Sequence, residues 1–208
     1  MVRIAVLVSG GGTNLQALLD AQDAGGLGPG RIALVVSNRK AAYALTRAAE
    51  HGVATAVLSK VMQPDPVLYD EALLRILQEN EIDLIALAGF LGIVGEKVLA
   101  AYPGRILNIH PALIPSFCGK GFYGLHVHEA VLARGCKVTG ATAHLVTAGV
   151  DEGPILLQKA VDVKEGDTPE VLQRRVMEEA EWLLLPQAVS LFCQGKLSVE
   201  NGVVHIQE

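Results

Sequence analysis

The chain has 208 residues, 50% of them hydrophobic and 19% charged, with a formal net charge of -5 at pH 7. This length suits one domain with a sizeable core, since domains usually contain roughly 100–200 residues. Lysine and arginine are scattered and provide no basic field, which argues against nucleic acid as a partner and favours small-molecule substrates.

The start of the chain and its cysteines bear on location. Strand-like sequence begins at Arg3 without a charged segment, an apolar stretch and a cleavage site, and no run reaches the ~18 apolar residues of a membrane span. Cys118, Cys136 and Cys193 are odd in number and lack Cys-x-x-Cys spacing, which is typical of reduced thiols rather than of a disulfide framework or zinc site. We expect a cytoplasmic protein, monomeric or homodimeric, that does not contact membranes.

A glycine loop follows the first predicted strand, Arg3 to Val8. The loop is Ser9-Gly10-Gly11-Gly12-Thr13-Asn14, and apolar residues at helical spacing begin at Leu15. The free N–H groups and positive end of a helix that starts here favour a phosphate site, into which we expect a side chain at Gly12 to project. The dinucleotide pattern fails because Leu15 replaces the third glycine, and no Gly-Lys-Ser/Thr follows for a nucleoside triphosphate. The alternative is that the glycines only form a tight turn.

Strand-like and helix-like segments then alternate. Strand patterns cover 32–36, 54–58, 83–87 and 105–107, and helical patterns cover 41–51, 67–80 and 94–102. This alternation predicts an α/β fold with a mostly parallel sheet covered by helices on both faces. Ala88 to Val94, after the fourth strand, suits either a wall against a flat heterocycle or ordinary core packing. We interpret Arg47, Glu50 and His51 as a solvated helix face.

We place the active site in the stretch from Ile106 to Pro115. Its first two residues are typical of the end of a covered strand, and Asn108 and His110, two apart in extended chain, point to the same side. Asparagine offers an amide donor and histidine a donor whose charge changes near neutral pH, so the pair suits a developing oxyanion. The competing interpretation is a turn cap at Asn108 and a core histidine at His110.

A loop and a short helix follow this stretch. Phe117 to Tyr123 is rich in glycine and aromatic residues, which suits a segment that closes over a site. A helical pattern covers 125–134 and carries His126 and His128. Residues two apart do not share a helix face, so we predict no metal site there.

Further polar side chains lie in the second half of the chain. A strand predicted over 137–146 carries Thr142 and His144 on one side, towards the space that His110 faces. Asp151 lies in an acidic loop before a strand predicted over 155–163. A surface turn is the simpler interpretation of Asp151 taken alone.

The last segments carry clear start and turn signals. Thr168 as N-cap and Pro169 in the first turn begin a long helix that runs towards Pro186, with a further helical segment to residue 194. Asn201-Gly202 predicts the turn of an edge hairpin over 196–206.

Five segments together resemble the phosphoribosylglycinamide formyltransferases, folate-dependent enzymes of purine synthesis. These segments are Ser9 to Gln16, Leu87 to Phe90, Ile106 to Pro115, Thr139 to His144 and Asp151 to Ile155. Asn-x-His-Pro-x-Leu-x-Pro with a later Asp-x-Gly-Pro is shared by the wider family that uses 10-formyltetrahydrofolate, including methionyl-tRNA formyltransferase and formyltetrahydrofolate deformylase. The glycine loop and the length narrow the resemblance, because the tRNA enzyme carries an extra C-terminal domain and the deformylase an extra N-terminal one.

The resemblance implies a single Rossmann-like formyltransferase domain over 1–208 with an antiparallel C-terminal part. Its half 1–105 binds phosphate, and its half 106–208 binds folate and carries the catalytic residues. The expected phosphoribosyl contacts are Gly11, Gly12, Thr13, Asn14 and Glu181. The expected folate contacts are Phe90, Leu91, Gly92, Ile93, Val94, Asn108, Val146, Thr147 and Asp151.

The resemblance further implies that Asn108, His110 and Asp151 are catalytic and that no metal takes part. The amine of 5′-phosphoribosylglycinamide attacks the formyl carbon of 10-formyltetrahydrofolate, Asn108 and a protonated His110 stabilise the oxyanion, and Asp151 keeps His110 charged. Thr142 supports Asn108 from behind, and His144 belongs with Thr142 to the residues that surround the catalytic ones.

The sequence departs from the family pattern at three points. Gly92 stands where an arginine is often found, and the arginine expected before Tyr69-Asp70 is absent. The last long helix is one residue longer than in the best-known members.

Two other function classes compete with formyl transfer. A deformylase hydrolyses the same folate but needs no phosphate loop. A nucleotide-binding module without chemistry needs no convergence of Asn108, His110 and Asp151.

Overall fold

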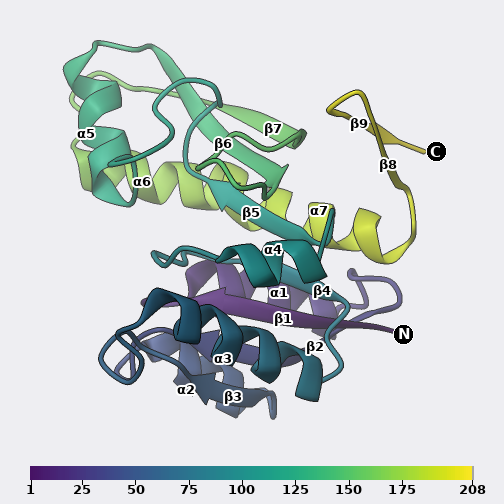
Figure 1. Ribbon diagram of the computed structural model, residues 1–208. Coiled ribbons are helices and arrows are strands. Elements are labelled where there is room, and N and C mark those ends of the chain that lie inside the picture. Colours follow the sequence, from purple (N-terminus) through teal and green to yellow (C-terminus); the bar gives the residue numbers. More distant parts are fainter. Residues whose placement is uncertain (208) are drawn as a thin grey trace.

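The computed structural model describes residues 1–207 and contains a seven-stranded sheet covered by helices on both faces (Figure 1). The strand order is β3-β2-β1-β4-β5-β6-β7. These strands are β1 (Val2–Val8), β2 (Gly30–Ser37), β3 (Ala54–Val57), β4 (Leu84–Leu87), β5 (Ile106–His110), β6 (Val138–Leu145) and β7 (Ile155–Asp162). The helices are α1 (Thr13–Asp23), α2 (Tyr43–Glu50), α3 (Pro66–Glu79), α4 (Glu96–Ala101), α5 (Leu125–Ala133), α6 (Pro169–Val176) and α7 (Trp182–Cys193). The predicted α/β fold is confirmed.

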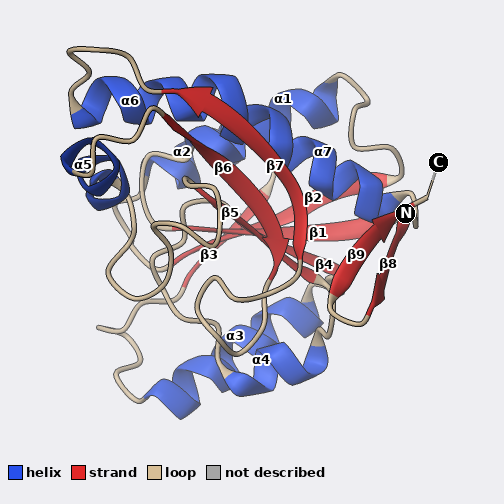
Figure 2. Ribbon diagram, turned by 90° about the horizontal axis from the view of Figure 1, so that it is seen from above, coloured by secondary structure: helices blue, strands red, loops and turns tan. Residues whose placement is uncertain are grey.

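The central strand β1 is apolar at nearly every position because helices cover both of its faces. Ile4, Val6 and Val8 pack into one buried cluster with α1, α2, α6 and α7, whereas Ala5 and Leu7 pack into a second cluster with α3 and α4. Figure 2 shows these two groups of helices on opposite sides of the strands. Successive side chains of a strand point to opposite faces, so a strand covered on both sides needs apolar residues throughout.

The sheet changes from parallel to antiparallel at β5. Strands β3, β2, β1, β4 and β5 pair in parallel, while β6 is antiparallel to β5 and β7 is antiparallel to β6. Pairing with β6 continues along β5 as far as His110, so the prediction of a strand that ends at Leu107 was too short. The polar residues Asn108 and His110 interrupt the apolar pattern of β5, but their backbone still takes part in the ladder.

The last long helix is continuous from Pro169 to Cys193. The Thr168 side chain accepts a hydrogen bond from the N–H of Val171, which is the predicted N-cap. Met177–Glu181 forms a π-helical turn between α6 and α7. A π turn lets a helix accommodate an additional residue without ending, so the helix continues through this segment.

Residues 197–206 form the predicted hairpin, with β8 (Leu197–Glu200) and β9 (Val203–Ile206). Both turn residues have positive φ, 51° at Asn201 and 78° at Gly202, as a two-residue hairpin turn requires. The hairpin is a separate two-stranded sheet and not an edge of the main sheet, which corrects the prediction. Within residues 1–207, no helix combines the length and the apolar character needed to cross a membrane.

Candidate active site

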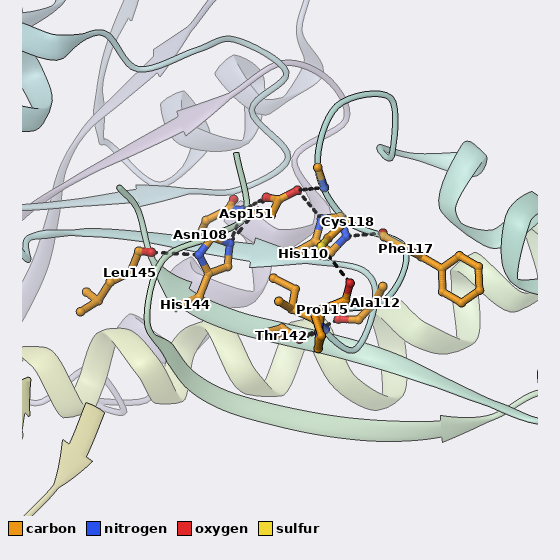
Figure 3. A network of polar contacts seen from close by, with 12 residues as sticks. Asn108, His110, Ala112, Pro115, Phe117, Cys118, Thr142, His144, Leu145 and Asp151 are labelled. Carbon is orange, nitrogen blue, oxygen red and sulfur yellow. Dashed lines mark hydrogen bonds and ion pairs between the residues drawn. The ribbon is translucent and has the colours of Figure 1, made fainter. Parts of the chain in front are cut away.

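Antiparallel pairing of β5 with β6 brings four polar side chains together (Figure 3). Asn108 lies opposite His144, and His110 lies opposite Thr142. The amide nitrogen of Asn108 is 3.0 Å from Nε2 of His144. Nδ1 of His144 lies 2.9 Å from the carbonyl oxygen of Leu145, which can only accept, so Nδ1 carries the hydrogen. In the neutral ring, Nε2 therefore accepts a hydrogen bond from the Asn108 amide.

Asp151 joins this group from the turn that follows β6. Its φ of 57° lies in the left-handed region, which aspartate adopts more readily than most residues. One carboxylate oxygen lies 3.5 Å from Nδ1 of His110, and the other lies 3.5 Å from the Asn108 amide and 3.7 Å from Nε2 of His144. Asp151 thus occupies a turn, but its side chain is only 11% exposed and points inward.

His110 is enclosed between two acceptors. Its Nδ1 faces Asp151, and its Nε2 lies 2.8 Å from the carbonyl oxygen of Phe117. Burial lowers the pKa of His110 below its ordinary value, while Asp151 and the Phe117 carbonyl raise it to a smaller extent. The net direction is opposite to the one expected if Asp151 kept His110 charged, because burial has the larger effect on this pKa. Asp151 nevertheless holds His110 closer to protonation than burial alone would allow.

The loop after β5 covers the side chains of His110 and Asp151 with its backbone. The N–H of Gly119 donates to Asp151 at 3.0 Å, and the Phe117 carbonyl faces His110. Burial raises the pKa of Asp151, but interactions with His144, Gly119 and His110 outweigh burial and hold that pKa below its ordinary value. The sequence indicated a closing loop here, but not the contacts of Phe117 and Gly119, because backbone groups leave no side-chain pattern.

Thr142 was expected to support Asn108, but its hydrogen bonds support the segment that follows β5. Its hydroxyl donates to the carbonyl of Ala112 at 2.7 Å and accepts from the N–H of Ile114 at 3.1 Å. The side chain of Gln158 donates to the same hydroxyl at 3.0 Å. The expected support of Asn108 comes from His144, because the β5–β6 register places His144, and not Thr142, opposite Asn108.

The glycine loop lies between β1 and α1. Within residues 1–207, the backbone N–H groups of Gly11, Gly12, Thr13 and Asn14 donate no hydrogen bond to the protein. Such a group of free donors at a helix N-terminus suits an anion. Gly12 has a φ of 74°, and a Cβ added there would lie 2.6 Å from Cβ of Ala44 on α2. A side chain at Gly12 would therefore run into α2, and not into the anion site as expected.

Asn14 and Glu181 meet beside this loop although 167 positions separate them. The Asn14 amide donates to the Glu181 carboxylate at 2.6 Å, and both residues are buried. Burial raises the pKa of Glu181 to about 7, against the opposing effect of the Asn14 hydrogen bond. The side-chain oxygen of Asn14 is buried without a partner and can accept from a ligand hydroxyl. Glu181 is the last residue of the π turn.

The segment that follows β4 is partly core and partly surface. Val94 is buried in the second cluster and Phe90 packs against it, while Leu91 and Ile93 are 50% and 74% exposed. The N–H of Leu91 donates to the hydroxyl of Ser9 at 2.8 Å, which ties this segment to the end of β1. The segment therefore combines the two alternatives, a packed anchor and an exposed apolar surface.

Gly92 packs closely against the ring of Phe90. A Cβ added at Gly92 would lie 2.5 Å from the ring of Phe90, so a side chain here displaces that ring.

The other expected folate contacts lie after β6, where Val146 packs against the second cluster and Thr147 is exposed. The two residues lie at the end of β6, where the N–H of Val146 donates to the carbonyl of Ile106 at 2.9 Å.

The two histidines of α5 point to different surroundings. Nδ1 of His126 lies 3.1 Å from the carboxylate of Glu129, whereas His128 is fully buried and neither of its ring nitrogens has a partner. In the described part of the chain, residues 1–207, no group of three or more His, Cys, Asp or Glu side chains is placed to hold a metal ion.

Comparison with known sequences identifies relatives along nearly the whole chain. A family model described as Formyl transferase matches residues 2–189. The chain is 35% identical to the phosphoribosylglycinamide formyltransferase of Haemophilus influenzae, over 99% of this chain and 94% of that protein. It is 41% identical, over 96% of its length, to the trifunctional purine biosynthetic protein adenosine-3 of Bos taurus. The chain spans only 19% of the length of that trifunctional relative.

Two solved structures share the fold. Glycinamide ribonucleotide transformylase 1 from Symbiobacterium toebii superposes with a TM-score of 0.94 at 47% identity, covering 100% of this chain and 95% of that one. A formyltetrahydrofolate deformylase from Pseudomonas syringae superposes with a TM-score of 0.89 at 24% identity, covering 100% of this chain and 66% of that one. The second likeness shows a common fold alone.

Proposed function

The chain belongs to the formyl transferase family, and we propose that it transfers the formyl group of 10-formyltetrahydrofolate to the amine of 5′-phosphoribosylglycinamide in purine biosynthesis. The observation that carries this proposal is the convergence of Asn108, His110 and Asp151 from β5 and the turn after β6. The full-length likeness to a glycinamide ribonucleotide transformylase supports the choice of acceptor.

In the proposed reaction, the acceptor amine attacks the formyl carbon and the carbonyl oxygen takes up negative charge. Asn108 and His110 stabilise this oxyanion as hydrogen-bond donors. The bond from the formyl carbon to N10 of the folate then breaks, and the proton that the amine loses passes to N10. Asp151 and His110 assist this proton transfer, since an ionised carboxylate beside an imidazole can accept and return a proton.

The donors that the oxyanion needs are engaged within the protein in the resting site. The amide of Asn108 points at His144 and Asp151, and both ring nitrogens of His110 face acceptors. The contact of Asn108 with Asp151 is 3.5 Å, longer than an ordinary hydrogen bond, so its hydrogen is the one most easily redirected. Substrate binding therefore replaces weak internal hydrogen bonds by bonds to the reacting group.

The glycine loop supplies the contact for the acceptor phosphate. Its free N–H groups at Gly11 to Asn14 suit a dianion, and the buried pair of Asn14 and Glu181 beside them suits the ribose hydroxyls. The folate lies against the exposed apolar residues Leu91 and Ile93 and the end of β6 at Val146 and Thr147. No metal is needed for this chemistry.

The proposal also includes a cytoplasmic location. It rests on the cysteine pattern, since Cys118, Cys136 and Cys193 are all free thiols. Free thiols are typical of a reducing compartment.

One assay tests the proposed function. Tetrahydrofolate formation from 10-formyltetrahydrofolate is followed with and without 5′-phosphoribosylglycinamide, and the formylated acceptor is quantified by mass spectrometry. Folate product that forms only with the acceptor, in equal amount to formylated acceptor, is the expected result. Product that forms equally well without the acceptor contradicts the proposal and identifies a hydrolase.

A further inference from the structure

Arg47 does not lie on a solvated helix face, as its sequence position indicated. Its side chain turns from α2 towards the glycine loop, where Nε donates to the carbonyl of Gly11 at 2.9 Å and Nη1 donates to the side chain of Gln16 at 2.8 Å. The guanidinium also stacks over the ring of Tyr43, 5.0 Å from its centroid. We propose that Arg47 is the positioning residue that orients the glycine loop for a phosphate monoester and supplies positive charge beside it.

The geometry of the peptide bond carries the orienting role. In a trans peptide, the carbonyl of one residue and the N–H of the next point in opposite directions. Arg47 holds the Gly11 carbonyl towards α2, so the N–H of Gly12 points away from α2 and into the anion site. The N–H of Ala44 holds the Gly10 carbonyl in the same way at 3.1 Å, which turns the N–H of Gly11 towards the site.

The charge of Arg47 is available to a ligand. Within residues 1–207, no carboxylate lies within ion-pair distance of its guanidinium, whose contacts are neutral groups. Two of its five N–H groups are engaged, both by neutral acceptors, so the guanidinium adds its positive charge from the α2 side of the loop. This chain lacks the arginine that the family pattern places before Tyr69-Asp70, on α3. Arg47 on α2 provides a positive charge from a different helix.

A second observation marks the same place as a ligand site. The buried side-chain oxygen of Asn14, two residues beyond Gly12, has no partner, and Glu181 lies beside it. A ligand that carries both a phosphate and hydroxyls can bind the free N–H groups of the loop and, at the same time, the pair of Asn14 and Glu181. The class of ligand is thus a sugar phosphate, and this inference rests on the proposed function for the identity of the acceptor.

The test compares three variants with the wild type. Arg47→Met keeps the apolar stem but removes charge and donors, and Arg47→Lys keeps the charge but removes Nε. Arg174→Met is the matched control, because Arg174 is an exposed arginine of α6 whose ion-pair partner, among residues 1–207, is Glu178. Ribose 5-phosphate and unphosphorylated ribose are titrated calorimetrically, and KM is measured for both substrates with the phosphorylated acceptor and with its riboside.

We expect Arg47→Met to weaken ribose 5-phosphate binding and to raise the acceptor KM by about 10-fold, as loss of one charge-assisted contact does. The folate KM, kcat at saturation and the kinetics of the riboside stay unchanged, Arg47→Lys recovers part of the loss, and the control behaves as the wild type. Equal effects on phosphorylated and unphosphorylated ligands, or no effect, overturn the role of Arg47. A wild-type enzyme that forms no product with the acceptor instead overturns the proposed function.

Discussion

Asp151 determines how readily His110 takes up a proton. Burial lowers the pKa of His110 and Asp151 raises it, so Asp151→Asn lowers that pKa further. Because the protonated ring stabilises the oxyanion better, the fall-off in kcat with rising pH moves to lower pH in the variant. We expect kcat to fall by about 10²-fold or more, with both KM values little changed.

The measurement is a pH–rate profile of kcat for both proteins, with His110 titrated by NMR. His126→Gln serves as a control, because His126 is an exposed histidine that pairs with Glu129. A His110 pKa that stays the same without Asp151, or a nearly normal kcat, returns Asp151 to the role of an ordinary turn residue.

Glu181 makes folding depend on pH in an unusual direction for an acid. Its pKa rises from 4.5 to about 7 in the folded protein, so the folded state binds a proton more tightly than the unfolded state does. The stabilising contribution is fully present below pH 4.5 and is lost as the pH rises to about 7. Relative to Glu181→Gln, the wild type should lose about 3 kcal/mol of unfolding free energy over this range.

Urea unfolding of both proteins at a series of pH values measures the difference between their free energies of unfolding. Other titrating groups contribute equally to both proteins and cancel in this difference. A difference that stays constant with pH shows that Glu181 is ionised in the folded protein.

At the scale of elements, the contact between the glycine loop and α2 makes Gly12 irreplaceable. Alanine at Gly12 must adopt a φ of 74° and place its Cβ 2.6 Å from that of Ala44, so α2 has to move. We expect Gly12→Ala to raise the acceptor KM at least 10-fold through misplaced N–H groups. The left-handed backbone alone costs about 1–2 kcal/mol of stability.

Gly52→Ala isolates the backbone cost, because Gly52 has a φ of 66° and a Cβ there meets nothing within 4 Å. Steady-state kinetics and urea unfolding are measured on both variants. If both lose the same stability and neither changes the acceptor KM, the packing of the loop against α2 has no role in binding.

At the scale of the whole molecule, the hairpin of β8 and β9 is an addition to the main sheet. It forms its own two-stranded sheet, and only Leu197 and Val204 of its strands pack against the main core. Deleting residues 197–208 should leave kcat and both KM values unchanged. The free energy of unfolding should fall by about 2 kcal/mol, since both side chains are only partly buried.

Kinetics and urea unfolding of the truncated chain measure these two effects. A truncated protein that folds but loses activity contradicts the view that the site is complete without the hairpin.

The sequence by itself determined the elements and the local signals. The apolar runs of the strands, the N-cap at Thr168 and the turn at Asn201-Gly202 depend on residues within a few positions of one another, so pattern and propensity predict them. The order of these elements, with the motif around Asn108 and His110, also predicted the fold class. That motif alone left a turn cap and a core histidine as alternatives.

The tertiary structure decided the partners of each functional side chain. The register of β5 on β6 assigns His144 rather than Thr142 to Asn108, and a single residue of slip would exchange the faces of the strand. The contact of Arg47 with Gly11 spans 36 positions and depends on how α2 packs beside the loop. The lowered pKa of His110 follows from its burial, and burial is a sum over distant residues that no local pattern encodes.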